Sequence, residues 1–253
     1  MAGRPRVVVS VGASVDGKVA LVRDALLMHR PSSELWAAIT PPVADSVDVM
    51  EVVKAQYGCN AVLEGSGSLV VEGATPEELP LYDGDGDELY EHFLPPEVTG
   101  QVSPPHMWFT VVDSRGRVRW TEDNENWDAL VLVSRSTPAD YLAYLRRERI
   151  CYLVAGDDRV DLAEAIALMG TELGITCVLS AAGGGLNGAL LRADLIDELH
   201  VTVLPALIGG LGTPSITDGP PLAVGETPAR LELLSVHADA GGTVRLHYAV
   251  PHN

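Results

Sequence analysis

The feature that most constrains the fold is a regular alternation of short apolar runs and helical patterns in the second half of the chain. In order, these are a strand over 150–157, a helix over 162–173, a strand from 175 into three glycines, a helix over 186–195 and a strand over 197–210. Strands that alternate with helices favour a mainly parallel sheet with helices on its faces. The pattern therefore predicts an α/β protein.

The rest of the chain supplies further elements of the same kind. The predicted segments are a strand over 6–14, a helix over 42–57, a strand from 61, a strand within 107–120 with a turn at Arg115-Gly116 and a second strand after it, a strand from 129, a helix over 138–149 and a hairpin around Gly241-Gly242. A hairpin at the end of the chain is antiparallel. We therefore expect a mostly parallel central sheet with a C-terminal antiparallel hairpin.

The region from Glu72 to Pro105 interrupts this alternation. It is rich in Pro, Gly, Asp and Glu and has little periodicity, so it is interpreted as an inserted loop or lid with one helical turn at Glu88–Phe93. A chain of 253 residues is long for one α/β domain and short for two. We expect a single domain over residues 1–253 with an insertion at about 72–105.

The charge of the chain excludes several classes of partner. The sequence has 17 Lys and Arg against 35 Asp and Glu, which gives a formal net charge of −18. This charge repels nucleic acids and anionic lipids, and no run of 18 apolar residues occurs. We therefore expect no nucleic acid and no membrane as partner. A phosphate group would need a local site made of backbone amides, helix ends and a few arginines.

Cysteines and histidines give no sign of a metal site. Cys59, Cys151 and Cys177 lack metal-ligand spacing, and their odd number is typical of a reducing compartment, so they are interpreted as core thiols of a cytoplasmic protein. The seven histidines show no paired spacing. We interpret His200 and His237 as ordinary strand residues and predict no metal.

Two glycine-rich junctions follow predicted strands. Gly183, Gly184 and Gly185 lie between an apolar strand and an apolar helix, where glycines permit positive φ and close approach of the backbone to a ligand. This turn can hold a pyrophosphate, or it can serve only tight strand-to-helix packing. Gly65-Ser66-Gly67 is a second candidate, although this sequence is also common in turns.

Charged residues follow two further strands. An arginine at position 135, after Ser134, can contact a ribose 2′-phosphate or remain exposed. Asp16 and Lys18 flank Gly17 directly after the first strand, at the edge where α/β sheets place ligands. They can bind a polar substrate, or they can form a solvated turn.

Several of these segments resemble one family in order along the chain. The matching sequences are SVDGKVA (14–20), AVLEGSGSLV (61–70), VVDSRGRV (111–118), VLVSR (131–135) and, most specifically, GGGLNGALLRADLIDELHVTVLPALIGG (183–210). They resemble the reductase domain of bifunctional riboflavin-biosynthesis enzymes and its stand-alone relatives, which are similar in fold to dihydrofolate reductase. The chain differs in having Ala181-Ala182 where riboflavin-pathway members often carry Glu before the glycines.

The resemblance implies a three-layer α/β/α fold, NADPH as cofactor, a small heterocyclic substrate and a homodimer. It places Gly183–Leu186 at the cofactor pyrophosphate, Ser134 and Arg135 near the 2′-phosphate, and Gly65, Ser66 and Gly67 facing the cofactor. Asp16 and Lys18 become candidate catalytic residues, and together with Asn187 they are the candidate substrate ligands. The implied activity is NADPH-dependent hydride transfer to a C=N or C=O bond, similar to that of pyrimidine reductases. Two alternatives stay open, namely a reductase of a specialised metabolite and a non-catalytic nucleotide-binding protein.

Overall fold

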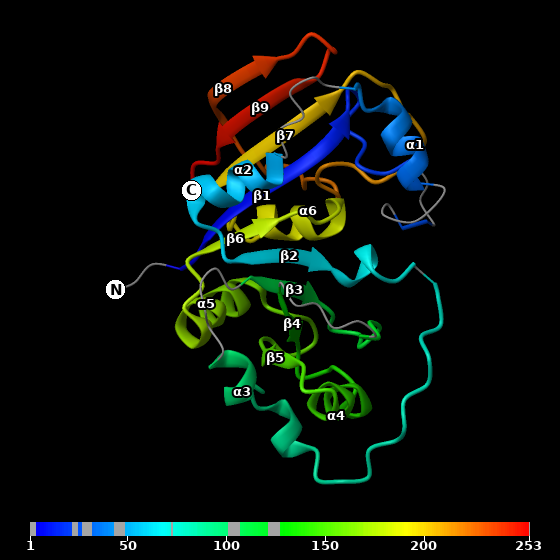
Figure 1. Ribbon diagram of the computed structural model, residues 1–253, viewed down its shortest axis with the longest axis vertical. Coiled ribbons are helices and arrows are strands. Elements are labelled where there is room, and N and C mark those ends of the chain that lie inside the picture. Colours follow the sequence, from blue (N-terminus) through cyan, green and yellow to red (C-terminus); the bar gives the residue numbers. More distant parts are fainter. Residues whose placement is uncertain are drawn as a thin grey trace. The chain divides into compact units, whose positions relative to one another are not determined.

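The computed structural model describes residues 4–21, 25–26, 32–42, 49–71, 73–100, 107–120 and 127–252 (Figure 1). Contacts between Cα atoms divide the chain into two compact units. The first unit contains residues 1–5 and 59–178, and the second contains residues 6–58 and 179–253. The prediction of one domain over residues 1–253 stays a prediction.

The first unit contains four parallel strands, adjacent in the order β5-β4-β3-β2. Their bounds are β2 Ala61–Gly65, β3 Trp108–Val112, β4 Asp128–Val133 and β5 Cys151–Val154. Every residue of β5 is buried, and so are the last four of β4. Strands of a parallel sheet are covered on both faces, which explains why they read as continuous apolar runs in the sequence.

Two helices of the first unit pack against β5, and their ends follow local sequence rules. They are α4 (Ala139–Arg147) and α5 (Leu162–Leu173). The Asp161 carboxylate caps α5 by accepting hydrogen bonds from the backbone N–H groups of Ala163 and Glu164. Gly174 ends the helix in the left-handed conformation, with φ of 63°. Both helices match their predicted positions to within two residues.

Part of the predicted insertion packs against α4 and β5 of the first unit. It contains the 3-10 helix η2 (Asp87–Tyr90), which begins one residue before the helical turn predicted at Glu88–Phe93, and the short α3 (Pro96–Thr99). Leu89 is buried against α4 and β5, and Phe93 forms an antiparallel bridge with Tyr152 of β5. Residues 80–85 are largely exposed. The lid function remains a prediction.

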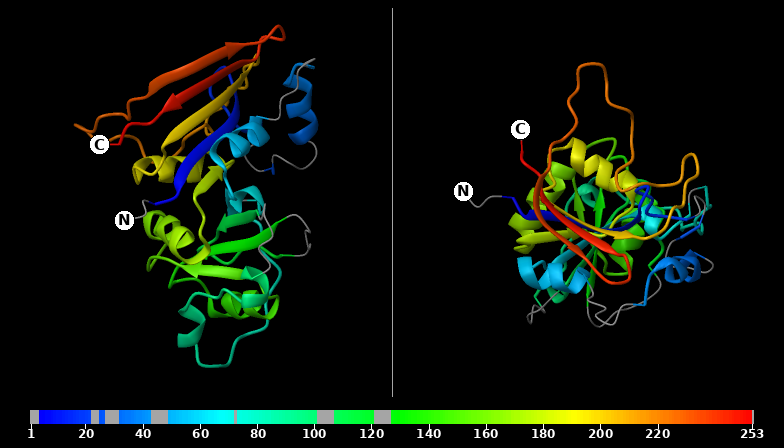
Figure 2. Two further views of the ribbon diagram at one scale, coloured as in Figure 1. Left: turned by 60° about the vertical axis from the view of Figure 1, so that its left-hand side comes forward. Right: turned by 90° about the horizontal axis from the view of Figure 1, so that it is seen from above.

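The second unit contains the adjacent strands β1-β7-β9-β8 and the last two residues of β6, the neighbour of β1. Their bounds are β1 Arg6–Ser14, β6 Cys177–Ser180, β7 Glu198–Leu204, β8 Glu232–Ala238 and β9 Val244–Ala249, and the helices are α1 Ser32–Ile39, α2 Val49–Tyr57 and α6 Gly184–Arg192. β1 and β7 are parallel, whereas β9 runs antiparallel to both β7 and β8. In the view from above in Figure 2, α2 and α6 lie on opposite sides of the strands of this unit. The predicted mixed α/β fold with a C-terminal antiparallel hairpin is confirmed.

Two predictions about local structure differ from the structure, and a third is tested only in part. The described residues 117–120 form no strand, because the Asp113 carboxylate accepts hydrogen bonds from the N–H groups of Arg117 and Val118 that would otherwise pair with a neighbouring strand. The helix predicted from Leu186 begins at Gly184. The helix predicted over 42–57 is described only as Val49–Tyr57, since residues 43–48 lie outside the described part of the chain.

The interpretation of all three cysteines as thiols is wrong. Cys59 and Cys177, both in the first unit, form a disulfide, and Cys151 is free and buried in β5. One disulfide and one thiol also make an odd number of cysteines, so the count alone does not identify a reducing compartment. Among the described residues, no helix is long and apolar enough to cross a membrane.

Candidate functional site

The first candidate segment follows β2 at the carboxyl edge of the parallel strands in the first unit. Gly65 ends β2, and the following Ser66–Ser68 form the 3-10 helix η1. Ser66 is buried, and its hydroxyl accepts a hydrogen bond from the Arg117 guanidinium at 3.1 Å. Gly67 is exposed. The segment therefore combines a fixed serine with exposed backbone that a ligand can approach.

The second candidate segment follows β4 at the same edge. The buried Ser134 and Thr137 fix the turn, because the Ser134 N–H donates to the Thr137 hydroxyl and the Thr137 N–H donates to the Ser134 carbonyl. Arg135 is exposed on this turn, and its guanidinium lies 3.8 Å from the Asp157 carboxylate. An exposed ion pair at this distance contributes little to stability, so the guanidinium can exchange Asp157 for a phosphate.

The triple glycine lies in the second unit and begins α6. Gly183 is the N-cap residue, with extended backbone, and no side chain caps the helix. Gly183 and Gly185 are exposed, and a Cβ on either would have no atom within 4 Å. Leu186 is half-buried. The first N–H groups of a helix lack partners within the helix and attract anions. These residues therefore fit a cofactor diphosphate.

The predicted reason for the glycines is partly wrong. None of the three has a positive φ. Gly184 is instead required by close packing, because a Cβ there would lie 2.1 Å from the Ser215 carbonyl oxygen and 2.5 Å from the Asp218 carboxylate. Packing thus explains Gly184, whereas Gly183 and Gly185 remain open to a ligand.

Asn187 is buried behind this turn rather than exposed. Its amide nitrogen donates to the carbonyls of Ala182 and Ile216 at 2.8 and 3.3 Å, and its amide oxygen accepts from the Ser180 hydroxyl at 2.9 Å. These contacts fix the residue that precedes the glycines. The position of Asn187 favours a positioning role, and its substrate contact stays a prediction.

Asp16 and Lys18 bind the loop that follows β7. The Asp16 carboxylate accepts hydrogen bonds from the Ser14 hydroxyl and from the N–H groups of Ile208 and Gly209, which hold its pKa at about 2. The Lys18 ammonium donates to the Thr213 carbonyl at 3.0 Å. Asp16 is exposed and Lys18 is half-buried. The turn is therefore ordered, and Asp16 stays ionised.

Comparison with known proteins identifies the family. The sequence model of the RibD C-terminal domain family matches residues 5–245. The chain belongs to this family.

Two relatives agree with this assignment, and one solved structure has a similar fold. A 2,5-diamino-6-ribosylamino-4(3H)-pyrimidinone 5′-phosphate reductase from Archaeoglobus fulgidus is 28% identical over 218 residues, covering 85% of this chain and 87% of the relative. The protein of the same name from Methanothermobacter thermautotrophicus is 26% identical over 230 residues, covering 91% of each chain. A pyrimidine reductase-like protein from Corynebacterium diphtheriae has a TM-score of 0.65 at 15% identity, over 98% of this chain and 93% of the other. The last comparison supports the fold.

Sequence reasoning missed one titratable residue in this RibD C-terminal domain. Glu64 precedes Gly65 at the end of β2, and its carboxylate accepts a hydrogen bond from the Ser68 hydroxyl at 2.7 Å. Burial raises its pKa to about 7. The signal was a single acidic residue at the end of an otherwise apolar strand. A carboxyl group with this pKa can exchange a proton near neutral pH.

Sequence reasoning also missed a group formed by Glu198, His200 and His247 in the second unit. Glu198 and His200 are two positions apart on β7, which places both side chains on one face. The sequence signal is therefore a Glu-x-His strand pattern. The contribution of His247 depends on the β7–β9 register, in which it lies opposite His200.

Proposed function

We propose that this protein is an NADPH-dependent reductase that converts the ribosylamino group of a pyrimidinone 5′-phosphate into a ribitylamino group. Membership of the RibD C-terminal domain family and two similar pyrimidinone-phosphate reductases support this proposal. The observation that carries it in the structure is the glycine turn, which begins α6 without a side-chain cap and leaves Gly183 and Gly185 exposed.

The cofactor contacts follow from the candidate segments. The N–H groups of Gly183–Leu186 would bind the diphosphate of NADPH, because the start of α6 attracts negative charge. Arg135 would bind the 2′-phosphate, for which a guanidinium is well suited, and the buried Ser134 would hold the turn beside it. Gly65–Gly67 would face the cofactor, with the exposed Gly67 nearest to solvent. The strong negative charge of the chain makes such local sites necessary.

Asp16 and Lys18 are the proposed substrate residues. Lys18 would polarise the acceptor group, since an ammonium stabilises negative charge that develops there. Asp16 would hold the turn and the β7 loop in place through its three hydrogen bonds. Asn187 would act indirectly by fixing Ala182 before the glycine turn.

The proposed reaction adds one hydride and one proton across a C=N or C=O bond of the substrate. When bound, NADPH supplies the hydride and leaves as NADP⁺. The protein orients the acceptor carbon, and proximity and orientation together can be worth roughly 7–11 kcal/mol of the barrier. A proton from solvent or from a protein acid balances the reaction.

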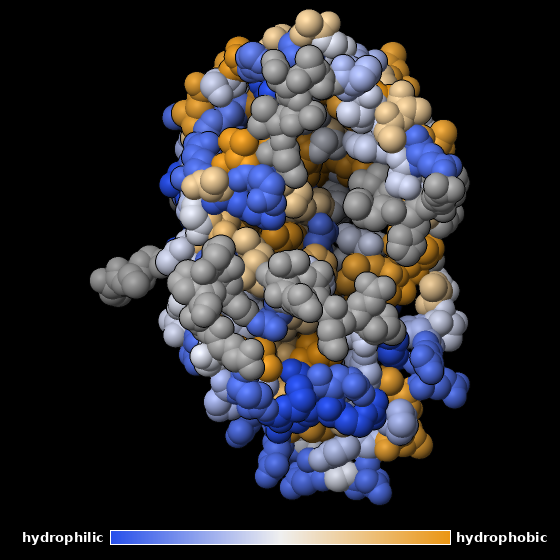
Figure 3. Space-filling model, viewed as in Figure 1, coloured by the Kyte–Doolittle hydropathy of each residue, from blue (hydrophilic) through white to orange (hydrophobic). Residues whose placement is uncertain are grey.

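The proposed functional unit is a homodimer formed through β8. Every residue of this strand is exposed, including Leu233, Leu234 and Val236, and Figure 3 shows hydrophobic residues at the surface of the upper part of the molecule, which contains β8 and β9. An exposed apolar edge strand offers unpaired backbone groups and apolar side chains with which a second chain can pair. We expect Val236→Lys to convert a dimer into a monomer in light scattering, and a monomeric wild-type protein would refute this part.

Lys18→Ala provides the test of the activity. We expect stopped-flow NADPH oxidation with the pyrimidinone phosphate to fall at least 100-fold, while the NADPH dissociation constant changes less than threefold. Lys18→Arg should recover part of the rate, because it restores the positive charge. Lys54→Ala is a matched control, since Lys54 pairs with Glu51 on α2. Unchanged turnover in Lys18→Ala would refute the role of Lys18, and absence of NADPH binding to the wild type would refute the proposed function.

A further inference from the structure

We propose that Glu198, His200 and His247 bind a divalent first-row transition metal ion, with Zn²⁺ as the best-suited ion. The proposal concerns the second unit alone and does not depend on the reductase activity. Two imidazoles and one carboxylate form a ligand set that proteins use for such ions. All three ligand atoms lie within 4.8 Å of one another.

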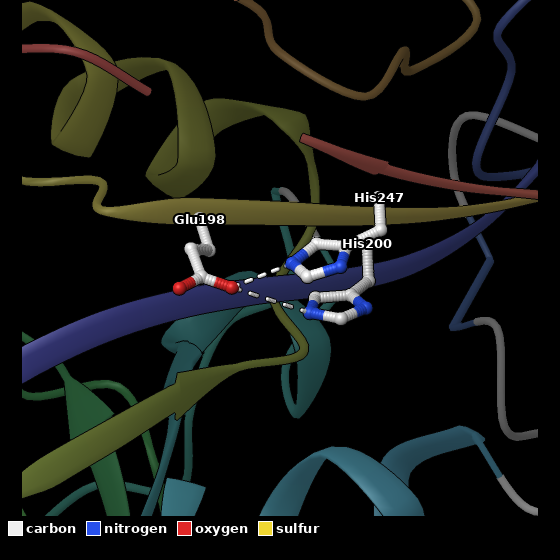
Figure 4. A group of neighbouring side chains, drawn as sticks. All are labelled: Glu198, His200 and His247. Atoms are coloured by element: carbon white, nitrogen blue, oxygen red, sulfur yellow. Dashed lines mark hydrogen bonds and ion pairs between the residues drawn. The ribbon is translucent and has the colours of Figure 1, made fainter. Parts of the chain in front are cut away.

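The sheet places these three side chains together. Glu198 and His200 project from the same face of β7, and His247 lies opposite His200 in the antiparallel register with β9. Figure 4 shows both imidazole rings beside one oxygen of the Glu198 carboxylate. The ligands therefore come from two hydrogen-bonded strands whose separation is fixed by the backbone.

The distances suit an ion after small side-chain adjustments. The Nε2 atoms of His247 and His200 lie 2.6 and 3.9 Å from Oε2 of Glu198. Neighbouring ligand atoms of a tetrahedral zinc are about 3.3 Å apart, which lies between these values. The rings are stacked with centroids 4.0 Å apart, so rotation about their χ2 bonds is needed to direct both Nε2 atoms at the ion.

Tyr57 and Arg6 complete the surroundings of the Glu198 carboxylate. The Tyr57 hydroxyl donates to Oε2 of Glu198 and lies 3.4 and 3.2 Å from the Nε2 atoms of His200 and His247. Its oxygen therefore lies close enough to the three ligand atoms to serve as a fourth ligand. The Arg6 guanidinium pairs with the other carboxylate oxygen, Oε1, and leaves Oε2 facing the histidines. Such outer contacts hold metal ligands in place.

A cavity gives an ion access to the group. Glu198 is only 5% exposed, but the histidine side chains line a cavity of about 230 Å³. The wall from α2 includes Val53 and Gln56, and β8 contributes His237. The rival explanation is a purely structural hydrogen-bond network in which protons take the place of the ion. The two explanations differ in whether added metal binds.

The test is metal binding by untagged, chelator-treated protein. We expect isothermal titration with ZnCl₂ to give one Zn²⁺ per chain, and Co²⁺ to give the intense visible absorption of a tetrahedral site. His200→Ala/His247→Ala should abolish both signals. His237→Ala is the matched control, because His237 lines the same cavity outside the three ligands, and it should bind normally. Absence of one-to-one binding to the wild type, or equal binding by the double variant, would overturn the proposal.

A second measurement uses only wild-type protein and so does not depend on how the variants fold. Diethyl pyrocarbonate modifies accessible histidines, and mass spectrometry locates the modified residues. We expect Zn²⁺ to lower modification of His200 and His247 at least fivefold and to leave His237 and His252 unchanged. Equal modification of His200 and His247 with and without Zn²⁺, or protection confined to other histidines, would overturn the proposal.

Discussion

Replacement of Glu64 by glutamine should make the stability of the protein less sensitive to pH. Burial raises the pKa of this carboxyl group from 4.5 to about 7 in the folded protein. The folded state therefore binds the proton more tightly than the unfolded chain. The stability that this proton contributes is complete below about pH 4.5 and is lost as the pH rises through about 7. Each tenfold change in proton affinity corresponds to about 1.4 kcal/mol, so the whole effect amounts to about 3 kcal/mol.

Urea unfolding of both proteins between pH 4.5 and 8.5 measures this effect. Glutamine keeps the size of the side chain and can still accept the hydrogen bond from Ser68, so it removes only the titration. We expect the variant to gain about 3 kcal/mol relative to the wild type between the acidic and the alkaline end of this range. Glu78→Gln, an exposed site in the same unit, controls for the general effect of removing a charge. A constant difference between Glu64→Gln and the wild type across this range would refute the reasoning.

Three further predictions concern the glycine turn and the cysteines. Gly184→Ala should lower the free energy of unfolding in urea by about 1–3 kcal/mol, because its Cβ would meet the Ser215 carbonyl oxygen. Gly185→Ala should unfold like the wild type but bind NADPH more weakly in a fluorescence titration. Equal stability of the two variants would contradict this. Asn187→Ala should lower the unfolding free energy by about 1–3 kcal/mol, since it leaves the buried Ala182 carbonyl and Ser180 hydroxyl without their partner. An unchanged urea midpoint would argue against that. Protein unfolded without reductant should show one reactive thiol per chain, that of Cys151, in an Ellman assay; three thiols would disprove the disulfide.

The order of strands and helices could be predicted because this sheet is largely parallel. β1, β4 and β5 are covered on both faces, so their sequences are continuous apolar runs with clear ends. In the described residues 117–120, the strand expected after Gly116 does not form for a local reason, because the backbone N–H groups of Arg117 and Val118 donate hydrogen bonds to the Asp113 carboxylate. The hydrophobic pattern of a sequence does not show where a side chain, instead of a neighbouring strand, accepts the backbone hydrogen bonds.

The parts of the candidate site that could be predicted are those formed by residues close together in the sequence. The glycines that begin α6 and the turn after β4 follow directly from strand and helix ends. The packing of Gly184 against Ser215 and the contact of Asn187 with Ile216 join segments about 30 residues apart, so neither could be read from the sequence. The group around Glu198 needs the register of β7 and β9, which the sequence alone does not specify.

The link between Cys59 and Cys177 determines how the first unit responds to a break in its backbone. The two residues are 118 positions apart, and the exposed residues 80–85 lie between them. A protease that cuts this stretch would open the chain without releasing either piece, because the sulfur bridge holds both ends of the intervening segment. The cut protein would migrate as one species in a non-reducing gel and as two fragments after reduction.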